Sequence, residues 1–363
     1  RYNELNVNGD PARVDPLGYA IDFQSHEVDR INRAGFEYQG DYSERPWAHT
    51  TFGYRVENEN GFVGDVNFGQ THGQRLSNEF YAQQQFTFGR LTAVAGGRFV
   101  HNSAFGNTGV PRIAVTFLAR RGGETLSDTR LHFSYATGYK EPRLEQTYAG
   151  PPYSFVNPGL KPERVRAFEA GIQQAFFRGR YTLSATYFNN LFRDQINYQE
   201  IDLVNFVGQY SNINRTFAHG AEIEVQAKLR TRLLLSTAYT YTSTQILDNP
   251  APIDSHYDVG QPLLRRPKHS ASMLLSYLGN RWGGNLSGSF VGRRPDDDFF
   301  GFNINHAAGY VRADLGGWYA INSRVTAYVN VENAIDRRYN EVAGYPSLPL
   351  NFRAGFRFRI GGE

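Results

Sequence analysis

The chain has 363 residues, no cysteine and a formal net charge of +3. Disulfide scaffolds, thiolate metal sites and cysteine nucleophiles are therefore excluded, and the small net charge gives no reason to expect a nucleic-acid partner. Mean hydropathy is −0.51, and no stretch approaches the roughly 18 unbroken apolar residues of a membrane-spanning helix. Aromatic residues nevertheless make up 15% of the chain, which suits a sheet with one apolar and one polar face.

Apolar and polar residues alternate with a period of two along much of the chain. From residue 222 to residue 229 the sequence reads E-I-E-V-Q-A-K-L. A helix cannot separate these two sets of side chains, because its period is 3.6 residues. The same alternation recurs at residues 168–176, 183–191, 325–332 and 352–360. The sequence therefore predicts an all-β protein, with about 15 strands of about 11 to 15 residues starting near Glu27.

The connections between the predicted strands fall into two classes. Short links made of turn residues lie at 89–90, 178–179, 230–231, 279–280 and 322–323. Long links rich in Gly, Pro and Asn lie at about 139–162, 193–212, 244–265, 294–306 and 336–347. Their alternation in the second half predicts an antiparallel up-and-down barrel with short turns on one rim and long loops on the other.

A soluble sandwich and a transmembrane barrel share this alternation, but three features favour the barrel. The strands are long enough to cross a membrane when tilted. Aromatic pairs such as Phe176-Phe177 and Trp318-Tyr319 lie near strand ends, as in interfacial girdles. The polar face carries charged residues in mid-strand, which the dry core of a sandwich would not hold unpaired.

Four segments, in the same order along the chain, resemble motifs of TonB-dependent outer-membrane receptors. They are Tyr139-Lys140-Glu141-Pro142, Asn157-Pro158-Gly159-Leu160-Lys161-Pro162-Glu163, Gly220-Ala221-Glu222-Ile223-Glu224 and Asn333-Ala334-Ile335-Asp336-Arg337-Arg338-Tyr339. The resemblance implies a barrel of about 22 strands with a plugged lumen, of which residues 1–363 would be the C-terminal part. It also implies that the N-terminal plug domain and its TonB-contacting box lie outside this sequence.

Structural roles in loops, turns and the lumen wall explain the motif residues better than catalytic or metal-binding roles do. We expect Asn157, Pro158, Leu160, Lys161, Pro162 and Glu163 to stiffen and anchor a long loop and to start the next strand. Glu222 and Glu224, two residues apart on one strand, fit a polar lumen better than a pair of catalytic carboxylates. Asn333 and Asp336 fit a turn at the rim better than a metal pair. No catalytic residue, resident cofactor or metal site is predicted.

Loop aromatics and arginines are the candidate ligand contacts, because arginine offers bidentate donors to carboxylate or catecholate oxygens and flat rings pack on chelate faces. Binding of lipopolysaccharide phosphates or a membrane girdle would explain the same residue types equally well. The candidates are Tyr148, Tyr153, Phe155, Arg265, Arg266, Arg293, Arg294, Phe299 and Phe300. A calcium site at Asp296–Asp298 is disfavoured, since a run of three aspartates is ordinarily just solvated and calcium needs six or more oxygens.

Through the resemblance, the expected function is energised uptake of a scarce solute: an iron–siderophore, haem, cobalamin or oligosaccharide. The expected partners are outer-membrane lipid and lipopolysaccharide, the TonB complex acting through a plug, and a small ligand such as a metal chelate, but no nucleic acid. The expected location is the outer membrane of a Gram-negative-type bacterium. A passive porin, an outer-membrane enzyme and an adhesion or signalling barrel remain as alternatives.

Overall fold

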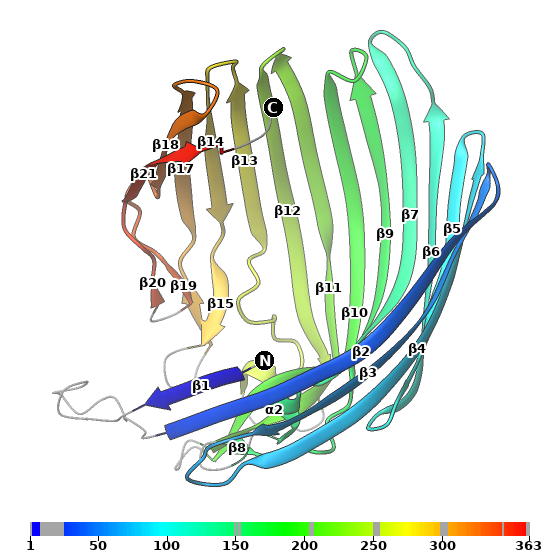
Figure 1. The fold of residues 1–363 in the computed structure, drawn as a ribbon, viewed down its shortest axis with the longest axis vertical. Coiled ribbons are helices and arrows are strands. Elements are labelled where there is room, and N and C mark those ends of the chain that lie inside the picture. Colours follow the sequence, from blue (N-terminus) through cyan, green and yellow to red (C-terminus); the bar gives the residue numbers. More distant parts are fainter. Residues whose placement is uncertain are drawn as a thin grey trace.

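The computed structural model describes residues 2–7, 25–148, 150, 154–202, 207–249, 255–297, 304–342 and 345–360. They form a large antiparallel sheet that curls around a central space (Figure 1). The strands of its first half are β1 (Tyr2–Val7), β2 (Ser25–Arg45), β3 (Ala48–Val63), β4 (Thr71–Phe88), β5 (Leu91–Asn102), β6 (Gly106–Arg120), β7 (Leu126–Lys140), β8 (Ser154–Phe155) and β9 (Glu163–Phe176).

The second half continues in the same way. Its main strands are β10 (Tyr181–Asp202), β11 (Val207–Arg230), β12 (Leu233–Asp248), β13 (His269–Leu278), β14 (Trp282–Val291), β17 (Tyr310–Ala320), β18 (Val325–Glu332) and β21 (Asn351–Phe358). The connections contain α2 (Leu144–Tyr148), the 3₁₀ turn η1 (Ser255–Tyr257), and two small ladders, β15 (Arg294–Asp297) with β16 (Ile304–Ala307) and β19 (Asn340–Val342) with β20 (Tyr345–Pro346).

Each main strand pairs antiparallel with the next main strand in the sequence, which confirms the predicted up-and-down order. The described sheet has 17 strands. Setting aside β1 and the two-residue β8, which pairs parallel with β11, leaves the fifteen strands expected from near Glu27. Many strands exceed the predicted 11 to 15 residues: β11 alone has 24.

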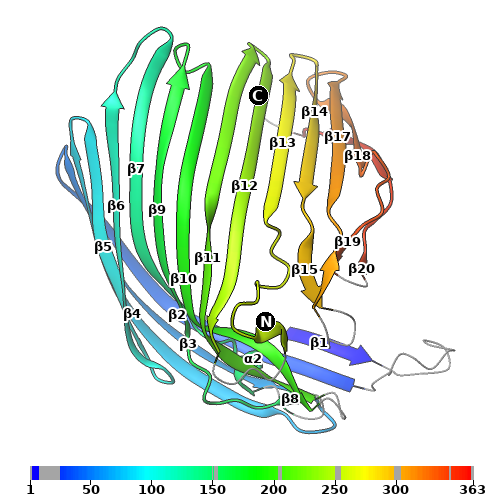
Figure 2. The same ribbon diagram turned by 180° about the vertical axis from the view of Figure 1, so that it is seen from behind.

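The short turns gather on one rim and the long connections on the other (Figures 1 and 2). Three of the expected long loops are corrected. Most of 193–212 is strand, because β10 and β11 stay paired as far as Asp202 and Val207. The links at 294–306 and 336–347 carry the ladders β15–β16 and β19–β20. Gly- and Pro-rich composition marked chain reversals there but could not show that the flanking residues pair with each other.

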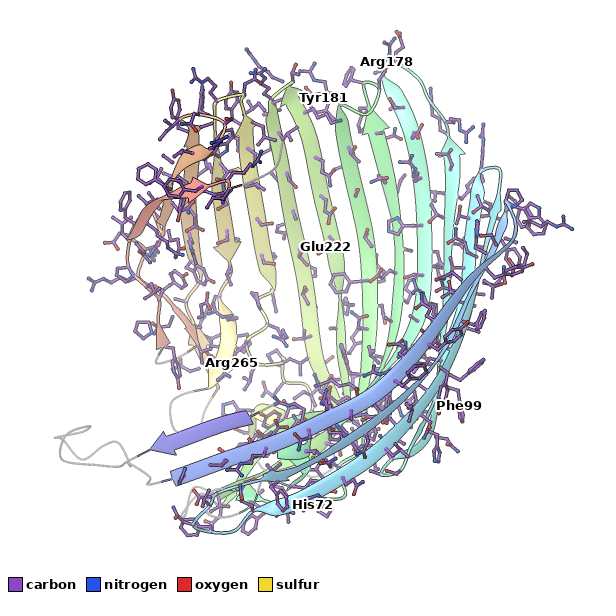
Figure 3. The ribbon with its side chains drawn as sticks, in the orientation of Figure 1. His72, Phe99, Arg178, Tyr181, Glu222 and Arg265 are labelled. Atoms are coloured by element: carbon purple, nitrogen blue, oxygen red, sulfur yellow. The ribbon has the colours of Figure 1, made fainter. Side chains whose placement is uncertain are left out.

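The two faces of the sheet have opposite character. Large apolar side chains such as Phe36, Phe80 and Phe99 are more than half exposed on the convex face, and Figure 3 shows Phe99 pointing away from the sheet. Glu222 lies on the concave face, where it is paired across strands with Thr186 and Thr240. Apolar side chains therefore face outward and polar ones inward, the inverse of a water-soluble protein and the arrangement of a membrane barrel.

Candidate functional site

The concave face holds a buried cluster of charges at the long-loop rim of the first strands. Arg75 on β4 forms ion pairs with Glu59 on β3 and, at 3.3 Å from Nε to Oε2, with Glu141 just after β7. The side chains of Arg75 and Glu59 are only 6% and 4% exposed. Arg33 on β2 adds a second cation, 2.6 Å from Oε1 of Glu59. Because charges removed from water are stable only when paired, this cluster fixes Glu141 to the inner wall.

Hydrogen bonds extend this cluster to β5. The Asn102 side-chain amide donates to Oε1 of Glu141 at 2.9 Å and to the Ser77 hydroxyl at 2.7 Å. An Arg75 guanidinium N–H also donates to the carbonyl of Pro142. Glu141 and Pro142 of the motif therefore turn the chain inward and join it to β4 and β5.

The segment that follows Glu141 folds back across the inner wall. Leu144 of α2 packs in a small buried cluster with Ile31 of β2 and Val63 of β3, and Tyr148 lies against its edge. Gly73 of β4 makes this approach possible: a Cβ placed there would lie 2.6 Å from the Tyr148 ring. Tyr148, predicted as a ligand contact, therefore packs against the protein's own wall.

The Asn157–Glu163 motif closes the loop against β10 and β11. The Asn157 side chain donates to the carbonyl of Tyr210 at 2.8 Å, and the Lys161 backbone N–H donates to Asn212 at 2.9 Å. Leu160 is 2% exposed and Pro162 is buried, whereas Pro158 is exposed. These contacts are all to the chain itself.

Glu163 ties the start of β9 to the neighbouring strands. One carboxylate oxygen lies 2.9 Å from Nζ of Lys140, and the other accepts the backbone N–H of Ile196 at 2.9 Å. Phe155, in the same loop, is 46% exposed. It is the one described aromatic of this loop with a large free surface.

Mid-strand, Glu222 accepts a hydrogen bond from the Thr240 hydroxyl at 3.1 Å. Glu224 lies two residues further along the same inner face. Gly220 is required where it stands, because a Cβ there would overlap the carbonyl oxygen of Tyr241. This stretch of wall presents carboxylates to the central space, and nothing in its geometry pairs them for acid–base chemistry.

The predicted arginines lie at the long-loop rim of the second half. Nε of Arg265 is 2.8 Å from Oδ1 of Asp296, whose side chain is fully buried. The expectation that Asp296 is simply solvated is therefore wrong, since the fold uses it as a buried partner for Arg265. Arg294, 4% exposed, donates to the backbone carbonyls of Asn340 and Glu341, so it joins β15 to β19. Arg266 and Arg293 are exposed.

A groove of about 690 Å³ lies between β16 and the β19–β20 ladder. Its polar lining includes His306, Arg338, Asn340 and Ser347. Tyr339 completes the wall, with its ring stacked on Tyr310 at a centroid distance of 3.7 Å. A cation, an imidazole and a flat ring around an open groove are groups able to hold an anionic chelate.

A tight turn carries the chain into this groove. Asn333, 3% exposed and with a φ of +51°, donates from its side-chain amide to the carbonyls of Arg337 and Leu348 at 3.0 and 3.1 Å. Asp336 accepts the backbone N–H of Leu350 at 2.9 Å. These contacts fix the backbone on either side of Arg338 and Tyr339.

The predicted ligand residues thus belong to two separate groups. Arg265 and Arg294 meet at β15, whereas Tyr148 and Phe155 belong to the loop on β3, β4 and β11. Tyr153, Phe299 and Phe300 lie outside the described residues. The sequence did not predict Arg338 as a groove residue, or Arg75 and Glu59 as loop anchors. No local signal could have found the anchors, because Arg75 and Glu141 are 66 positions apart.

The described residues contain no group of three His, Cys, Asp or Glu side chains that could hold a metal ion. None of their helices has the length and apolar character needed to cross a membrane.

Comparison with known proteins identifies the family of the chain. A family model described as "TonB dependent receptor-like, beta-barrel" matches residues 1–334. An uncharacterized TonB-dependent receptor of Haemophilus influenzae is 24% identical over 291 residues, covering 77% of this chain and 73% of the relative. The metal-pseudopaline receptor CntO of Pseudomonas aeruginosa is 28% identical over 186 residues, covering 50% of this chain and 25% of the relative.

Among solved structures, the siderophore receptor PirA from Acinetobacter baumannii has the same fold, with a TM-score of 0.73 at 16% identity. The match covers 98% of this chain and 58% of that one, so this chain spans little more than half of the solved receptor. The family match, the polar inner wall and the apolar outer face agree. The chain belongs to the TonB-dependent receptor β-barrel family, whose members are outer-membrane proteins of Gram-negative bacteria.

Proposed function

We propose that this chain is the barrel wall of a receptor that takes up a metal chelate of the siderophore class, with energy delivered by TonB. Family membership supports the TonB-driven step. The relative named as a metal-pseudopaline receptor supports a metal chelate over haem, cobalamin or an oligosaccharide. In this proposal the metal is cargo, and the barrel performs no covalent chemistry. In this proposal TonB acts through a plug domain of the kind that the sequence resemblance implies.

The observation that carries the proposal is the groove between β16 and β19–β20. It opens at the long-loop rim, the expected extracellular side, and it brings together Arg338, His306 and Tyr339. Metal chelates are commonly anionic and carry oxygen donors, which an exposed arginine can bind with paired N–H groups. The buried Arg294 fixes the ladder beneath the groove through its two backbone contacts. We propose Arg338 and His306 as ligand contacts, with Phe155, Arg266 and Arg293 as further exposed contacts on the same rim.

Uptake of a ⁵⁵Fe-labelled siderophore by cells that carry the full-length receptor tests the proposal. Uptake should be saturable and should disappear in cells without TonB. Arg338→Gln should raise the half-saturation concentration about tenfold, since one charge-assisted contact is worth roughly 1.4 kcal/mol. Arg337→Gln is the matched control, because Arg337 is an exposed neighbour outside the groove.

Two results would overturn the proposal in different ways. Uptake that continues unchanged without TonB, together with steady conductance in planar bilayers, would show a passive porin. TonB-dependent uptake that is equal in Arg338→Gln, Arg337→Gln and the parent protein would keep the transporter and reject this groove as its binding site.

A further inference from the structure

Three arginines form an unusual group on the convex face near the long-loop rim. Arg164 and Arg166 lie on β9, and Arg193 lies on β10. They line a shallow hollow of about 250 Å³ together with Thr137, Tyr139 and Leu191. All three arginines are exposed. They lie within strands and not in loops, so the loop pattern of the sequence did not predict them as ligand residues.

Strand register shows that these side chains face outward. Tyr139, Arg164 and Arg193 are aligned across β7, β9 and β10, and residues aligned in this way share a face. Phe168 lies on the same face of β9, four residues from Arg164, and its ring meets Phe133 at 5.3 Å. The same register chain leads through β6 and β5 to Phe99, which Figure 3 shows pointing away from the sheet.

Their height corresponds to the edge of the apolar band. The outward positions of β9 from Phe168 to Phe176 are mostly apolar and span about 26 Å of strand at ~3.3 Å per residue. Tilted by about 40°, this stretch covers about 20 Å of the apolar band of a membrane barrel, which is about 25 Å tall. Arg166 and Arg164 lie two and four residues beyond it, on the long-loop side. They are therefore at the level of lipid headgroups.

The positive charge of this group has no counterpart in the described part of the chain. No hydrogen bond or ion pair links the guanidinium groups of Arg164, Arg166 and Arg193 to any described residue. The next arginine in the row, Arg215 on β11, is by contrast 3.6 Å from Asp248. Like charges aligned across strands are destabilising. An external anion bound at the membrane interface would offset the repulsion among these three arginines.

We propose that this patch, defined as Arg164, Arg166 and Arg193 with Tyr139, binds the phosphate groups of a lipopolysaccharide molecule in the outer leaflet. Arginine binds phosphate through paired N–H groups. The outward apolar residues just below the patch, Phe168 and Tyr187, lie where the acyl chains of the same lipid would pack. This inference does not depend on which solute the receptor transports.

Binding of lipid A to the full-length receptor, purified from outer membranes in a non-ionic detergent and stripped of lipid, tests the proposal. Bisphosphorylated lipid A should bind at least about tenfold more tightly than the same lipid with its phosphates removed. The triple variant Arg164→Gln, Arg166→Gln, Arg193→Gln should lose this preference. The corresponding triple lysine variant should keep most of it, because charge at the right height is retained.

The matched control replaces three exposed arginines of the opposite rim, in Arg121→Gln, Arg178→Gln, Arg232→Gln. It removes equal charge and should bind lipid A within twofold of the parent protein. Heat-modified migration in gels checks that each barrel is folded, and the single variant Arg193→Gln serves if the triple variant fails this check. Equal binding by the glutamine triple variant and its control would overturn the proposal. Displacement of lipid A by inorganic phosphate at equal phosphate concentration would also overturn it, by showing a small-anion site.

Discussion

The long connections are held in different ways in two parts of the sheet. We call these parts the first wall, β2 to β7, and the second wall, β13 to β21. The loop after β7 folds inward: its Leu144 is buried against β2 and β3, and its Glu141 pairs with the buried Arg75 of β4. The connections after β14 and β18 instead form their own ladders at the rim. The first wall therefore depends on contacts between distant segments, and the second on backbone bonds within short ones.

This difference has consequences for stability. In the first wall, a change on β3 or β4 should release a loop that belongs to another part of the chain. In the second wall, a substitution should destabilise only the turn or ladder that contains it. Four substitutions with successively smaller expected losses of stability test this contrast.

Arg75→Met should be the most damaging change. It removes the cation shared by Glu141 and Glu59, which is 4% exposed, and leaves Glu59 only the 56% exposed Arg33. Breaking a buried pair on one side costs about 3–5 kcal/mol. Urea unfolding of the receptor in detergent micelles, followed by tryptophan fluorescence, measures the loss. The control is Arg98→Met: Arg98 lies 2.6 Å from Glu79 but is 40% exposed, so we expect about 1 kcal/mol or less. Equal losses in the two variants would show that burial of the Arg75 cluster does not matter.

Gly73→Ala should push Tyr148 away from β4, because the new Cβ would lie 2.6 Å from the ring. Overpacking of this kind costs about 1–3 kcal/mol, measured by the same unfolding experiment. Gly288→Ala, whose Cβ would meet nothing closer than 3.8 Å, should change stability by less than about 0.5 kcal/mol. If Tyr148→Ala does not reduce the penalty of Gly73→Ala, the contact between them is not its cause.

Asn333→Ala should loosen the second wall only locally. It removes three side-chain hydrogen bonds from a buried turn: two with the backbone of Arg337 and one to the carbonyl of Leu348. We expect a cost of about 1–3 kcal/mol. Amide hydrogen exchange should accelerate over residues 333–350 and stay unchanged over residues 141–148. Faster exchange in both segments would mean that the two walls are not independent.

Arg178→Ala should have the smallest effect. Arg178 pairs with Glu124 at the short-turn rim, but the two side chains are 73% and 81% exposed. Exposed pairs of this kind contribute less than about 1 kcal/mol, and often nothing measurable. The midpoint of urea unfolding should therefore shift little. A loss as large as that of Asn333→Ala would show that this rim is more constrained than its exposure suggests.

Much of the fold could be predicted from local patterns. Alternation at Glu222–Leu229 assigned Ile223 to the outer face and Glu222 to the inner face, as the register and Figure 3 show. The short turns at 89–90, 279–280 and 322–323 follow from the same logic and were placed correctly. The error at 193–212 arose because asparagine and glycine there suggested a loop, whereas pairing between β10 and β11 overrides that local preference.

The candidate site was less predictable. Arginines in loops were chosen as ligand contacts, yet Arg294 is buried and bonded to backbone, and Arg265 is paired with Asp296. Arg338 was part of a recognised motif, but only the β19–β20 ladder shows that it lines a groove. The sequence shows that a residue is an arginine, but not whether its side chain is bonded within the protein or open to a ligand.

Local patterns were enough to predict most strands, their two faces, their consecutive order and the family, because a period of two and short turn motifs act within a few residues. Contacts between distant segments appear only in the folded sheet: Glu141 pairs with Arg75, Tyr148 covers Gly73, and the outward patch joins Arg164, Arg166 and Arg193. Those contacts join strands whose register is set by the whole curled sheet. Local sequence patterns do not show which side chains from distant segments will be in contact.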